Sequence, residues 1–344
     1  MAGFPAFPKN LSTGIRKSSK ATVKTLNKEA LLFFRAIPRK AIWGRRVVKD
    51  YFGYEDYPDG IGQTWAFADQ PGNLSSRCIK GPFQGESLHT LWKNHEELFA
   101  SRFQEFPFII SLVGPSEDLS IQVHPGKRTA EAQGFKMGKN EAWYFIRTDD
   151  SSIVYGHNAV SKEELAEKIR NEQWDSLFQT IPVHDGDFVY IPAGTIHAMG
   201  KNNIVYEIQQ ATDLTYRIYD YGRKDAKGNV RELHTEMALK SIWESQEEAR
   251  PFPEKRTAHV GDGTITEYIS NESFTVASIR CAGRARIKNK GYKLCTVVEG
   301  RGKINSQEIG MGDHFLISAL SGGIETQGEF CLLITCEESI LDLL

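Results

Sequence analysis

Short apolar runs separated by turn residues constrain the fold of this chain more than any other feature. Each run is rich in β-branched and aromatic residues, which fit a pleated, half-buried surface, and each is short for a helix. The runs predict strands at residues 106–113, 119–123, 142–146, 153–155, 188–191, 204–208 and 214–219. Closely spaced short strands of this kind are typical of a β-barrel or a β-sandwich. We therefore expect a mostly β fold.

Two helical segments interrupt the expected strands. Ser161 and Glu164 form a capping-box signature ahead of Leu165 and Ile169, which predicts a helix from this point. A second helix is expected over residues 233–248, where apolar residues recur at helical spacing. Residues 43–98, in contrast, are rich in Gly, Pro and aromatic residues without helical periodicity.

An internal repeat predicts the domain organisation. Gly-Asp-Phe-Val-Tyr-Ile-Pro at residues 186–192 matches Gly-Asp-His-Phe-Leu-Ile-Ser at residues 312–318, which indicates two related barrels in tandem. The position equivalent to His197 is Gly323, so we expect the second barrel to be structural. Pro251 and Pro253 mark a linker. The expected domains are an N-terminal basic extension (1–42), a catalytic barrel with helical insertions (43–250) and a degenerate C-terminal barrel (251–344).

The first 40 residues differ in composition from the remainder. They hold nine Lys and Arg residues and a single acidic residue, Glu29, a profile shared with transit peptides. Residues 23–37 can also place Leu26, Leu31 and Phe34 on one side of a helix. We favour this second interpretation, a basic helical extension docked to the body of the protein.

The composition excludes several classes of function. The 42 basic and 44 acidic side chains give a net charge of −2, which supplies no general attraction for nucleic acid or anionic membrane. No run approaches the roughly 18 apolar residues of a membrane-spanning helix. Five cysteines without a Cys-x-x-Cys pair indicate a reducing compartment. We expect a soluble, cytoplasmic protein that binds neither nucleic acid nor membrane.

Three motifs carry metal-binding side chains. Gln122 and His124 alternate along one strand and therefore share a face. His197 follows a tight Pro-Ala-Gly turn, a spacing that resembles the second motif of the cupins. Glu141 begins the strand after the first motif. Each motif alone is compatible with a structural role, but together they offer two nitrogen and two oxygen ligands for one divalent ion, with expansion to five ligands when substrate enters.

Several longer segments together resemble type I mannose-6-phosphate isomerases of the short bacterial form. The resemblance begins near Trp43 and weakens after Trp243. It rests on IWG, LSIQVHP, GKNEAWYFI, IVYGHNAVSKEEL, GDFVYIPAGTIHAMG and EIQQATDLTYRIYDYGRKDAKGNVRELH. The resemblance implies tandem cupin-like jelly-roll barrels with a few inserted helices. It also implies one zinc ion per chain, held by Gln122, His124, Glu141 and His197.

The same resemblance implies interconversion of mannose 6-phosphate and fructose 6-phosphate through a cis-enediol. It requires no organic cofactor, and we expect a monomer or a weak homodimer. Arg217 matches the active-site arginine of the family, although a surface salt bridge is the ordinary role of an arginine. Lys139 is a candidate for proton transfer unless it is a solvated turn lysine, and Glu207 and Asp213 are both candidates for the general base. The expected substrate-binding residues are Ser120, Arg223 and Lys224.

Four positions depart from the family pattern. Gln63 replaces an acidic residue, Ser111 replaces a lysine, and Gly126 and Lys127 stand where Asp or Asn is usual. They lie outside the metal-ligand set and motivate one alternative, a non-catalytic sugar-phosphate-binding cupin. A second alternative is an iron oxygenase with two histidines and one carboxylate, against which Gln122 as a fourth ligand argues.

Overall fold

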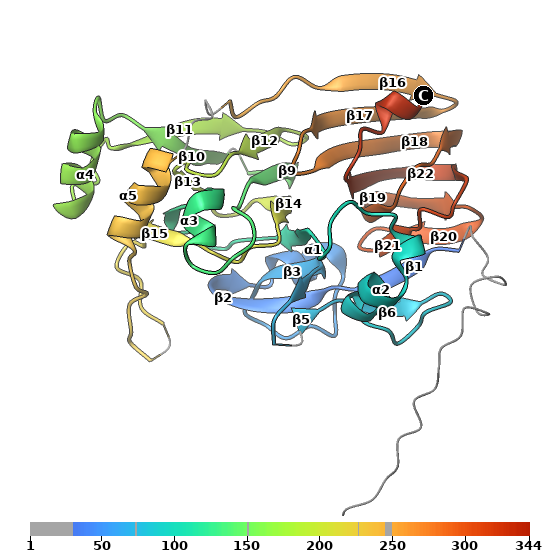
Figure 1. The fold of residues 1–344 in the computed structure, drawn as a ribbon, viewed down its shortest axis with the longest axis horizontal. Coiled ribbons are helices and arrows are strands. Elements are labelled where there is room, and N and C mark those ends of the chain that lie inside the picture. Colours follow the sequence, from blue (N-terminus) through green and yellow to red (C-terminus); the bar gives the residue numbers. More distant parts are fainter. Residues whose placement is uncertain (1–29, 73, 150, 226, 245–249) are drawn as a thin grey trace, which may run out of the picture.

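The computed structural model describes residues 30–72, 74–149, 151–225, 227–244 and 250–344. Two groups of strands lie side by side, an earlier one in green and yellow and a later one in orange and red (Figure 1). The mostly β prediction is confirmed. Within these residues no helix is long and apolar enough to cross a membrane.

Two sheets face each other in the first barrel. The larger has the strand order β12-β9-β14-β7-β3-β2. Its bounds are Phe188–Ile191, Glu141–Arg147, Ile204–Gln210, Phe108–Val113, Ile61–Phe67 and Ile37–Arg45. The smaller has the order β11-β10-β13-β8-β15. Its bounds are Phe178–Val183, Ser151–His157, His197–Ala198, Ile121–Val123 and Tyr216–Tyr219.

The second barrel is built on one sheet of nine strands. Its order is β16-β17-β18-β22-β19-β21-β1-β6, with β20 paired to β19. The bounds are Arg256–Val260, Gly263–Ser270, Thr275–Lys288, Gly323–Cys336, Lys293–Ile304, His314–Ile317, Leu32–Arg35, Arg77–Lys80 and Gln307–Gly310 for β20. A small hairpin pairs β4 (Asp69–Gln70) with β5 (Leu74–Ser75). A short 3-10 helix, η3 (Leu341–Leu343), ends the chain.

The two barrels share one strand order. In the first, β7, β9, β12 and β14 are arranged as β12-β9-β14-β7, and in the second, β18, β19, β21 and β22 are arranged as β21-β19-β22-β18. The two Gly-Asp pairs of the repeated motif immediately precede the equivalent strands β12 and β21. The expected tandem repeat is therefore present in the topology as well as in the sequence.

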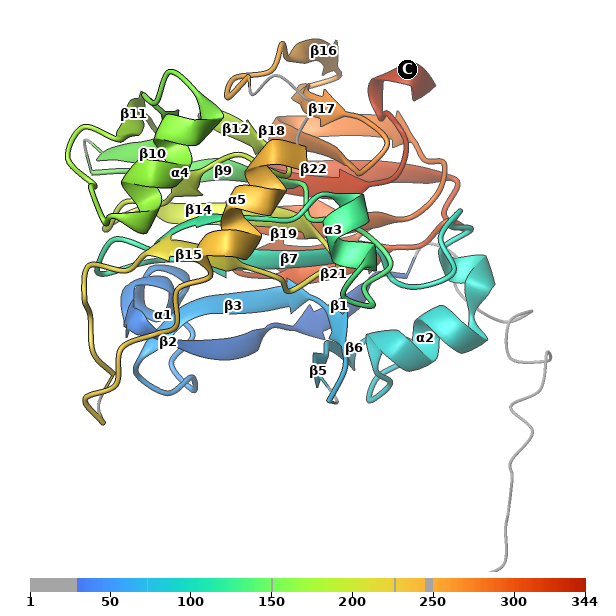
Figure 2. The same cartoon turned by 60° about the vertical axis from the view of Figure 1, so that its left-hand side comes forward.

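The helices on the smaller sheet follow the predicted periodicity. Helices α4 (Lys162–Arg170) and α5 (Thr235–Glu244) cover its outer face together with α3 (Lys127–Glu131), as Figure 2 shows. The Ser161 side chain accepts a hydrogen bond from the Glu164 backbone N–H, which confirms the predicted cap. The end expected for the second helix lies outside the described residues.

Residues 43–98 hold two short helices and one 3-10 turn that periodicity did not reveal. They are α1 (Val47–Phe52), α2 (Leu88–Asn94) and η2 (Glu96–Leu98). The two α-helices have six and seven residues, so neither repeats its apolar spacing often enough to form a recognisable pattern.

The helix expected at residues 23–37 is wrong in its described part. Leu32–Arg35 is strand β1, inserted between β21 and β6. Phe33 belongs to the core of the second barrel, whereas Leu32 and Phe34 belong to the core between the barrels. Period-two burial on both faces explains why a run of apolar residues here forms a strand. Strand β2 also continues across position 43, where a domain boundary was expected. Residues 1–29 of the extension lie outside the described residues.

The six-stranded sheet has two apolar faces. One face contributes Tyr144 and Ile208 to a core that also contains Phe274 and Leu333 of the second barrel. The other face contributes Trp143 and further residues to the interior of the first barrel. The sheet is therefore buried on both sides, and its inner face points at the five-stranded sheet.

Candidate metal centre and active site

Three polar side chains lie on adjacent strands of the five-stranded sheet. Gln122 on β8 pairs with His197 on β13 and with Arg217 on β15. Their neighbours Ile121 and Ile218 face the opposite way, into the apolar layer beneath helices α4 and α5. The predicted alternation is thus correct, and it places an amide, an imidazole and a guanidinium on the inner face of the first barrel.

Backbone carbonyls fix the tautomers of the two candidate histidine ligands. His124 Nδ1 lies 3.0 Å from the Leu214 carbonyl oxygen, and His197 Nδ1 lies 2.9 Å from the Thr195 carbonyl oxygen. A carbonyl can only accept, so each Nδ1 carries the proton and each Nε2 presents a lone pair. Burial lowers the pKa of His124 to about 3 and also lowers the pKa of His197. Both rings are therefore neutral, as metal ligands must be.

Glu141 completes a triad with these histidines. Its Oε2 atom lies 3.0 Å from His124 Nε2, and the ligand atoms of Glu141, His124 and His197 all lie within 4.8 Å of one another. Burial opposes ionisation of Glu141, whereas the neighbouring charge of Lys139 favours it, and the pKa of this carboxyl is lowered.

Two buried polar atoms of the triad without hydrogen-bond partners among the described residues indicate that the triad fits a metal ion. His124 Nε2 and Glu141 Oε2 are buried, and neither has a hydrogen-bond partner within the part of the chain that the structure describes. A lone pair faces an anionic oxygen at hydrogen-bond distance with no proton between them. A divalent cation would satisfy both atoms, and two imidazoles with one carboxylate are a suitable donor set for a transition metal.

Gln122 lies beside the triad in a different orientation from the one expected of a ligand. Its Nε2 atom lies 3.4 Å from His197 Nε2, while its Oε1 atom lies 3.4 Å from the hydroxyl of buried Ser120. A 180° turn of the amide exchanges the two atoms, and only the turned amide offers oxygen to a cation. Ser120 therefore contacts the candidate ligand Gln122.

Lys139 and Asp213 have very different surroundings. Lys139 is 5% exposed, and its Nζ atom lies 3.3 Å from Glu141 Oε2, so it is part of the site and not a solvated turn lysine. Asp213 is exposed, although it precedes Leu214, whose carbonyl orients His124.

Glu207 lies on β14 on the inner face of the first barrel. It accepts hydrogen bonds from Ser111 Oγ (2.9 Å) and Trp143 Nε1 (3.1 Å). Burial and the nearby charge of Glu141 raise the pKa of Glu207 to about 8. Trp143 packs edge-on against His197, with ring centroids 5.5 Å apart.

Ser111 and Trp143 are parts of the site that sequence reasoning missed. Ser111 was expected outside the metal-ligand set and Trp143 was not singled out as a site residue, yet both contact Glu207. Period-two alternation from Glu141 places Trp143 on the same face, which is the signal that could have identified it.

The register also shows why the second barrel lacks an equivalent site. Aligning Ile191 with Ile317 makes Lys293 the counterpart of Glu141, and Lys293 is buried with its Nζ atom 2.5 Å from the Lys290 carbonyl. Apolar or weakly polar side chains replace the Ser111, Glu207 and Trp143 cluster. The replacements are Ala277, Ile334 and Cys295.

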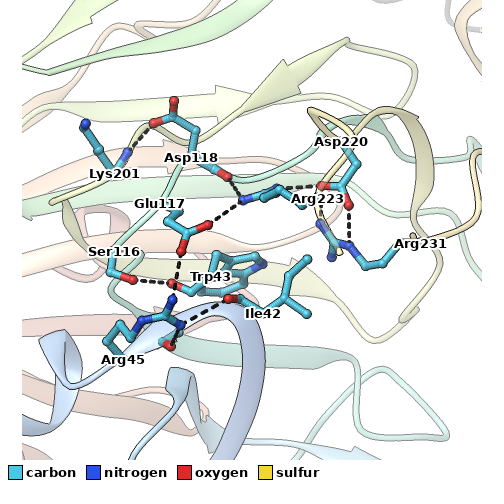
Figure 3. A network of polar contacts seen from close by, with 11 residues as sticks. Ile42, Trp43, Arg45, Ser116, Glu117, Asp118, Lys201, Asp220, Arg223 and Arg231 are labelled. Atoms are coloured by element: carbon cyan, nitrogen blue, oxygen red, sulfur yellow. Dashed lines mark hydrogen bonds and ion pairs between the residues drawn. The ribbon is translucent and has the colours of Figure 1, made fainter. Parts of the chain in front are cut away.

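Arginines and carboxylates form a network around Asp220 and Arg223 (Figure 3). The charges of Arg231, Asp220 and Arg223 in this network act on Arg217. Arg223 donates hydrogen bonds to Asp220 (2.5 Å) and to the Asp118 carbonyl (2.5 Å), and Arg231 donates to both oxygens of Asp220 (2.7 and 2.5 Å). Glu117 lies between Arg223 (3.8 Å) and Arg45 (2.9 Å). Arg223 is thus held in place by protein groups.

Arg217 retains unused donor capacity. Its Nη1 donates to the Glu232 carbonyl (2.9 Å), while its buried Nε has no hydrogen-bond partner among the described residues. Burial, and after it the charge of Arg231, lowers the pKa of Arg217. Lys224 is exposed and forms an isolated bridge with Val230.

The other three departures from the family pattern, Gln63, Gly126 and Lys127, lie at two places in the first barrel. Gln63 lies on β3 opposite Val113 of β7, within the sheet that carries Glu207. Gly126 precedes α3, and Lys127 begins it as an exposed residue 3.8 Å from Glu131.

Comparison with known proteins identifies the family. Residues 32–154 match the model of the phosphomannose isomerase type I catalytic domain, and residues 264–336 match that of the mannose-6-phosphate isomerase cupin domain. Mannose-6-phosphate isomerase ManA of Bacillus subtilis is 37% identical over 86% of this chain and 96% of its own length. The chain belongs to the type I phosphomannose isomerase family. The family resemblance and the cupin-like fold expected from the sequence are both confirmed.

Other phosphomannose isomerases agree with this assignment. The mannose-6-phosphate isomerase of Streptococcus mutans is 35% identical over 83% of this chain and 92% of its own length. The crystal structure of the Bacillus subtilis mannose 6-phosphate isomerase superimposes with a TM-score of 0.84, at 33% identity, covering 89% of this chain and 99% of that one. A putative mannosephosphate isomerase from Archaeoglobus fulgidus shares the fold at 19% identity, with a TM-score of 0.68 over 92% of this chain and 99% of its own.

Proposed function

We propose that the protein is a zinc-dependent isomerase that interconverts mannose 6-phosphate and fructose 6-phosphate. The observation that carries this proposal is the buried triad of His124, Glu141 and His197, with two acceptor atoms facing each other 3.0 Å apart. Membership of the phosphomannose isomerase family supports the choice of substrate and argues against an iron oxygenase.

The reaction moves a hydrogen between C1 and C2 of the sugar through a cis-enediol, so it needs a proton carrier and a stabiliser of oxyanion charge. Zinc held by the triad, with the turned amide of Gln122, would supply Lewis-acid stabilisation of that charge. Arg217, on the strand beside Gln122, would bind an enediol oxygen with its free donors.

Proton transfer is assigned to Lys139. Its Nζ atom is buried 3.3 Å from Oε2 of Glu141, one of the residues that would hold the ion. Glu207 has one oxygen bonded to Ser111 and the other to Trp143, so we give it an orienting role. Asp213 is exposed and is the weakest of the proposed catalytic residues. Arg223 and Lys224 are proposed to bind the phosphate of the substrate. Ser120 is proposed to contribute to substrate binding through its contact with Gln122.

Elemental analysis combined with an isomerase assay, before and after chelation, tests this proposal. We expect about one zinc per chain, loss of activity on chelation, and recovery when zinc is restored. Protein that is fully loaded with zinc and converts neither sugar phosphate would contradict the proposal. Calorimetric binding of mannose 6-phosphate without turnover would instead support the sugar-phosphate-binding alternative.

We further propose that the protein acts in the cytoplasm, as a monomer or a weak homodimer, without nucleic-acid or membrane partners. The near-balanced charge of the chain supports the absence of such partners. Sedimentation at several protein concentrations would test the oligomeric state.

A further inference from the structure

Asn140, the residue before Glu141, uses all of its polar groups. Its backbone N–H donates to Gln210 Oε1 (3.0 Å), and its carbonyl accepts from the Gln210 N–H (3.0 Å). Its side-chain Oδ1 accepts from the Ala193 N–H (2.8 Å), and its Nδ2 donates to Ser273 Oγ (2.9 Å). Because a backbone N–H can only donate, the orientation of the Asn140 amide is fixed.

The turn that contains Ala193 contacts all three ligand segments. Ala193 bonds Asn140, the residue next to Glu141. Gly194 donates its backbone N–H to the His124 carbonyl (2.9 Å). The Thr195 carbonyl accepts the proton of His197 Nδ1 (2.9 Å). The position of this turn, residues 192–195, therefore sets how the triad comes together.

Ser273 brings the second barrel to the same place. It lies between β17 and β18, is 9% exposed, and donates its backbone N–H to Asn271 Oδ1 (2.9 Å). The next residue, Phe274, is fully buried and packs against Tyr190 of β12, with ring centroids 6.2 Å apart. The Ser273 hydroxyl is thus held rigidly against Asn140 by its own barrel.

We propose that the second barrel stabilises the metal centre through Ser273 and Asn140. Asn140 is a positioning residue that ties the start of β9 to the turn at residues 192–195, and Ser273 fixes the Asn140 side chain. The second barrel, which contributes none of the proposed metal ligands, would thus have a role in the metal centre of the first barrel. The inference rests on the proposed function, since it concerns retention of the proposed zinc ion.

The experiment measures the rate at which zinc leaves the loaded full-length protein in excess chromophoric chelator. Ser273→Ala removes the hydrogen bond from Asn140 Nδ2 and leaves the Ala193–Asn140 bond in place, and we expect zinc release about threefold to tenfold faster. Asn140→Ala also frees the Ala193 N–H, and we expect release about tenfold to a hundredfold faster. Both are measured below the unfolding temperature of the variant.

Thr335→Val is the matched control. It removes the hydrogen bond between Thr335 and Tyr206 (2.7 Å), which also joins the two barrels but involves none of the ligand segments. We expect a similar loss of thermal stability with zinc release within about twofold of the wild-type rate. The inference would be overturned if Ser273→Ala released zinc at the wild-type rate. It would also be overturned if Ser273→Ala and Thr335→Val accelerated zinc release equally. A wild-type protein that binds no zinc would overturn the proposed function itself.

Discussion

Two backbone carbonyl oxygens determine which ring nitrogen of each candidate histidine ligand carries the proton. The Leu214 and Thr195 carbonyls take the Nδ1 protons of His124 and His197, so both Nε2 atoms are free to bind a cation. Each carbonyl belongs to a segment between strands, where the backbone is not used in a ladder. The ligand set is thus specified by its supporting backbone as well as by its side chains.

Replacing His197 tests the ligand assignment. We expect His197→Ala to lose zinc during purification or dialysis, because the remaining donors leave the ion incompletely coordinated. Metal content per chain is the measurement. A His184→Ala variant, which changes an exposed histidine, serves as the control. Full zinc content in His197→Ala would contradict the assignment.

Replacing Arg217 tests whether this residue acts in turnover and not in metal binding. We expect Arg217→Ala to retain zinc but to lower kcat by about 100-fold or more, because a charge that stabilises the enediol oxygen is lost. Zinc content and steady-state rates are measured on the same preparation. Equal turnover in the variant and the wild type would show that the role of Arg217 is misassigned.

Much of the site could be predicted from alternation along strands. Gln122 and His124 were expected to share one face because they alternate along the strand, and Ile121 and Val123 do face the opposite way, into the apolar layer. Arg217 was expected at the site only from the family resemblance, and the register places it beside Gln122. The amide orientation of Gln122, the bonds of Glu207 and the bridge through Asn140 depend on contacts between residues distant in sequence. No local pattern encodes such contacts.

At the scale of elements, a buried histidine joins the segment that follows α1 to the second barrel. His314 on β21 lies between the hydroxyls of Thr296 (3.0 Å from Nδ1) and Tyr54 (3.0 Å from Nε2), and Tyr54 donates to the Gly312 carbonyl (3.0 Å). The Nε2–H therefore donates to Tyr54, and Nδ1 accepts from Thr296. Burial of the ring among neutral partners disfavours its charged form.

Acid should destabilise the protein through this histidine. Burial lowers the pKa of His314 to about 3 in the folded state, so between pH 6.5 and 3 the unfolded chain binds more protons. Stability associated with His314 is complete above pH 6.5 and declines as the pH falls. We expect the difference in unfolding free energy between wild type and His314→Gln to shrink by up to about 3 kcal/mol from pH 6.5 to 4.

Urea unfolding at several pH values measures this effect. His259→Gln, which changes an exposed histidine on β16, is the control and should give a curve parallel to that of the wild type. The same metal-site histidines are present in every variant, so their titration cancels in the comparison. A parallel curve for His314→Gln would contradict the prediction.

Helices and strands were predicted correctly where one segment carries several independent sequence signals. Helix α4 carries both a cap and three buried residues at helical spacing, and the strand of residues 188–191 was predicted with its observed bounds. Strand β1 was mistaken for helix because Leu31 to Phe34 are apolar at consecutive positions, which fits a strand buried on both faces as well as a helix. Only its partners β21 and β6 settle the difference.

At the scale of the whole molecule, the two barrels share one apolar core. This core contains Tyr206 and Ile208 from the first barrel together with Phe274, Leu294 and Leu333 from the second. Neither barrel can expose that face without losing the burial of both. The molecule should therefore unfold as one cooperative unit rather than barrel by barrel.

Phe274→Ala tests this coupling. Phe274 is fully buried in the shared core, so we expect the truncation to lower the free energy of unfolding by about 3–5 kcal/mol. Calorimetry should show a single transition in both the wild type and the variant, shifted to lower temperature. Two separate transitions, with only one of them shifted, would show that the barrels fold independently.

Strand β1 has a consequence for biosynthesis. The strand lies at residues 32–35, but its partner β21 ends at residue 317, so the ribosome must translate all of residues 36–317 before both edges of β1 are occupied. Strand β6, at residues 77–80, can pair with one edge of β1 early, but the edge that faces β21 must remain unpaired, or be shielded by a chaperone, throughout that interval. Strand β1 is thus synthesised before every other described strand, yet it is among the last to complete its pairing.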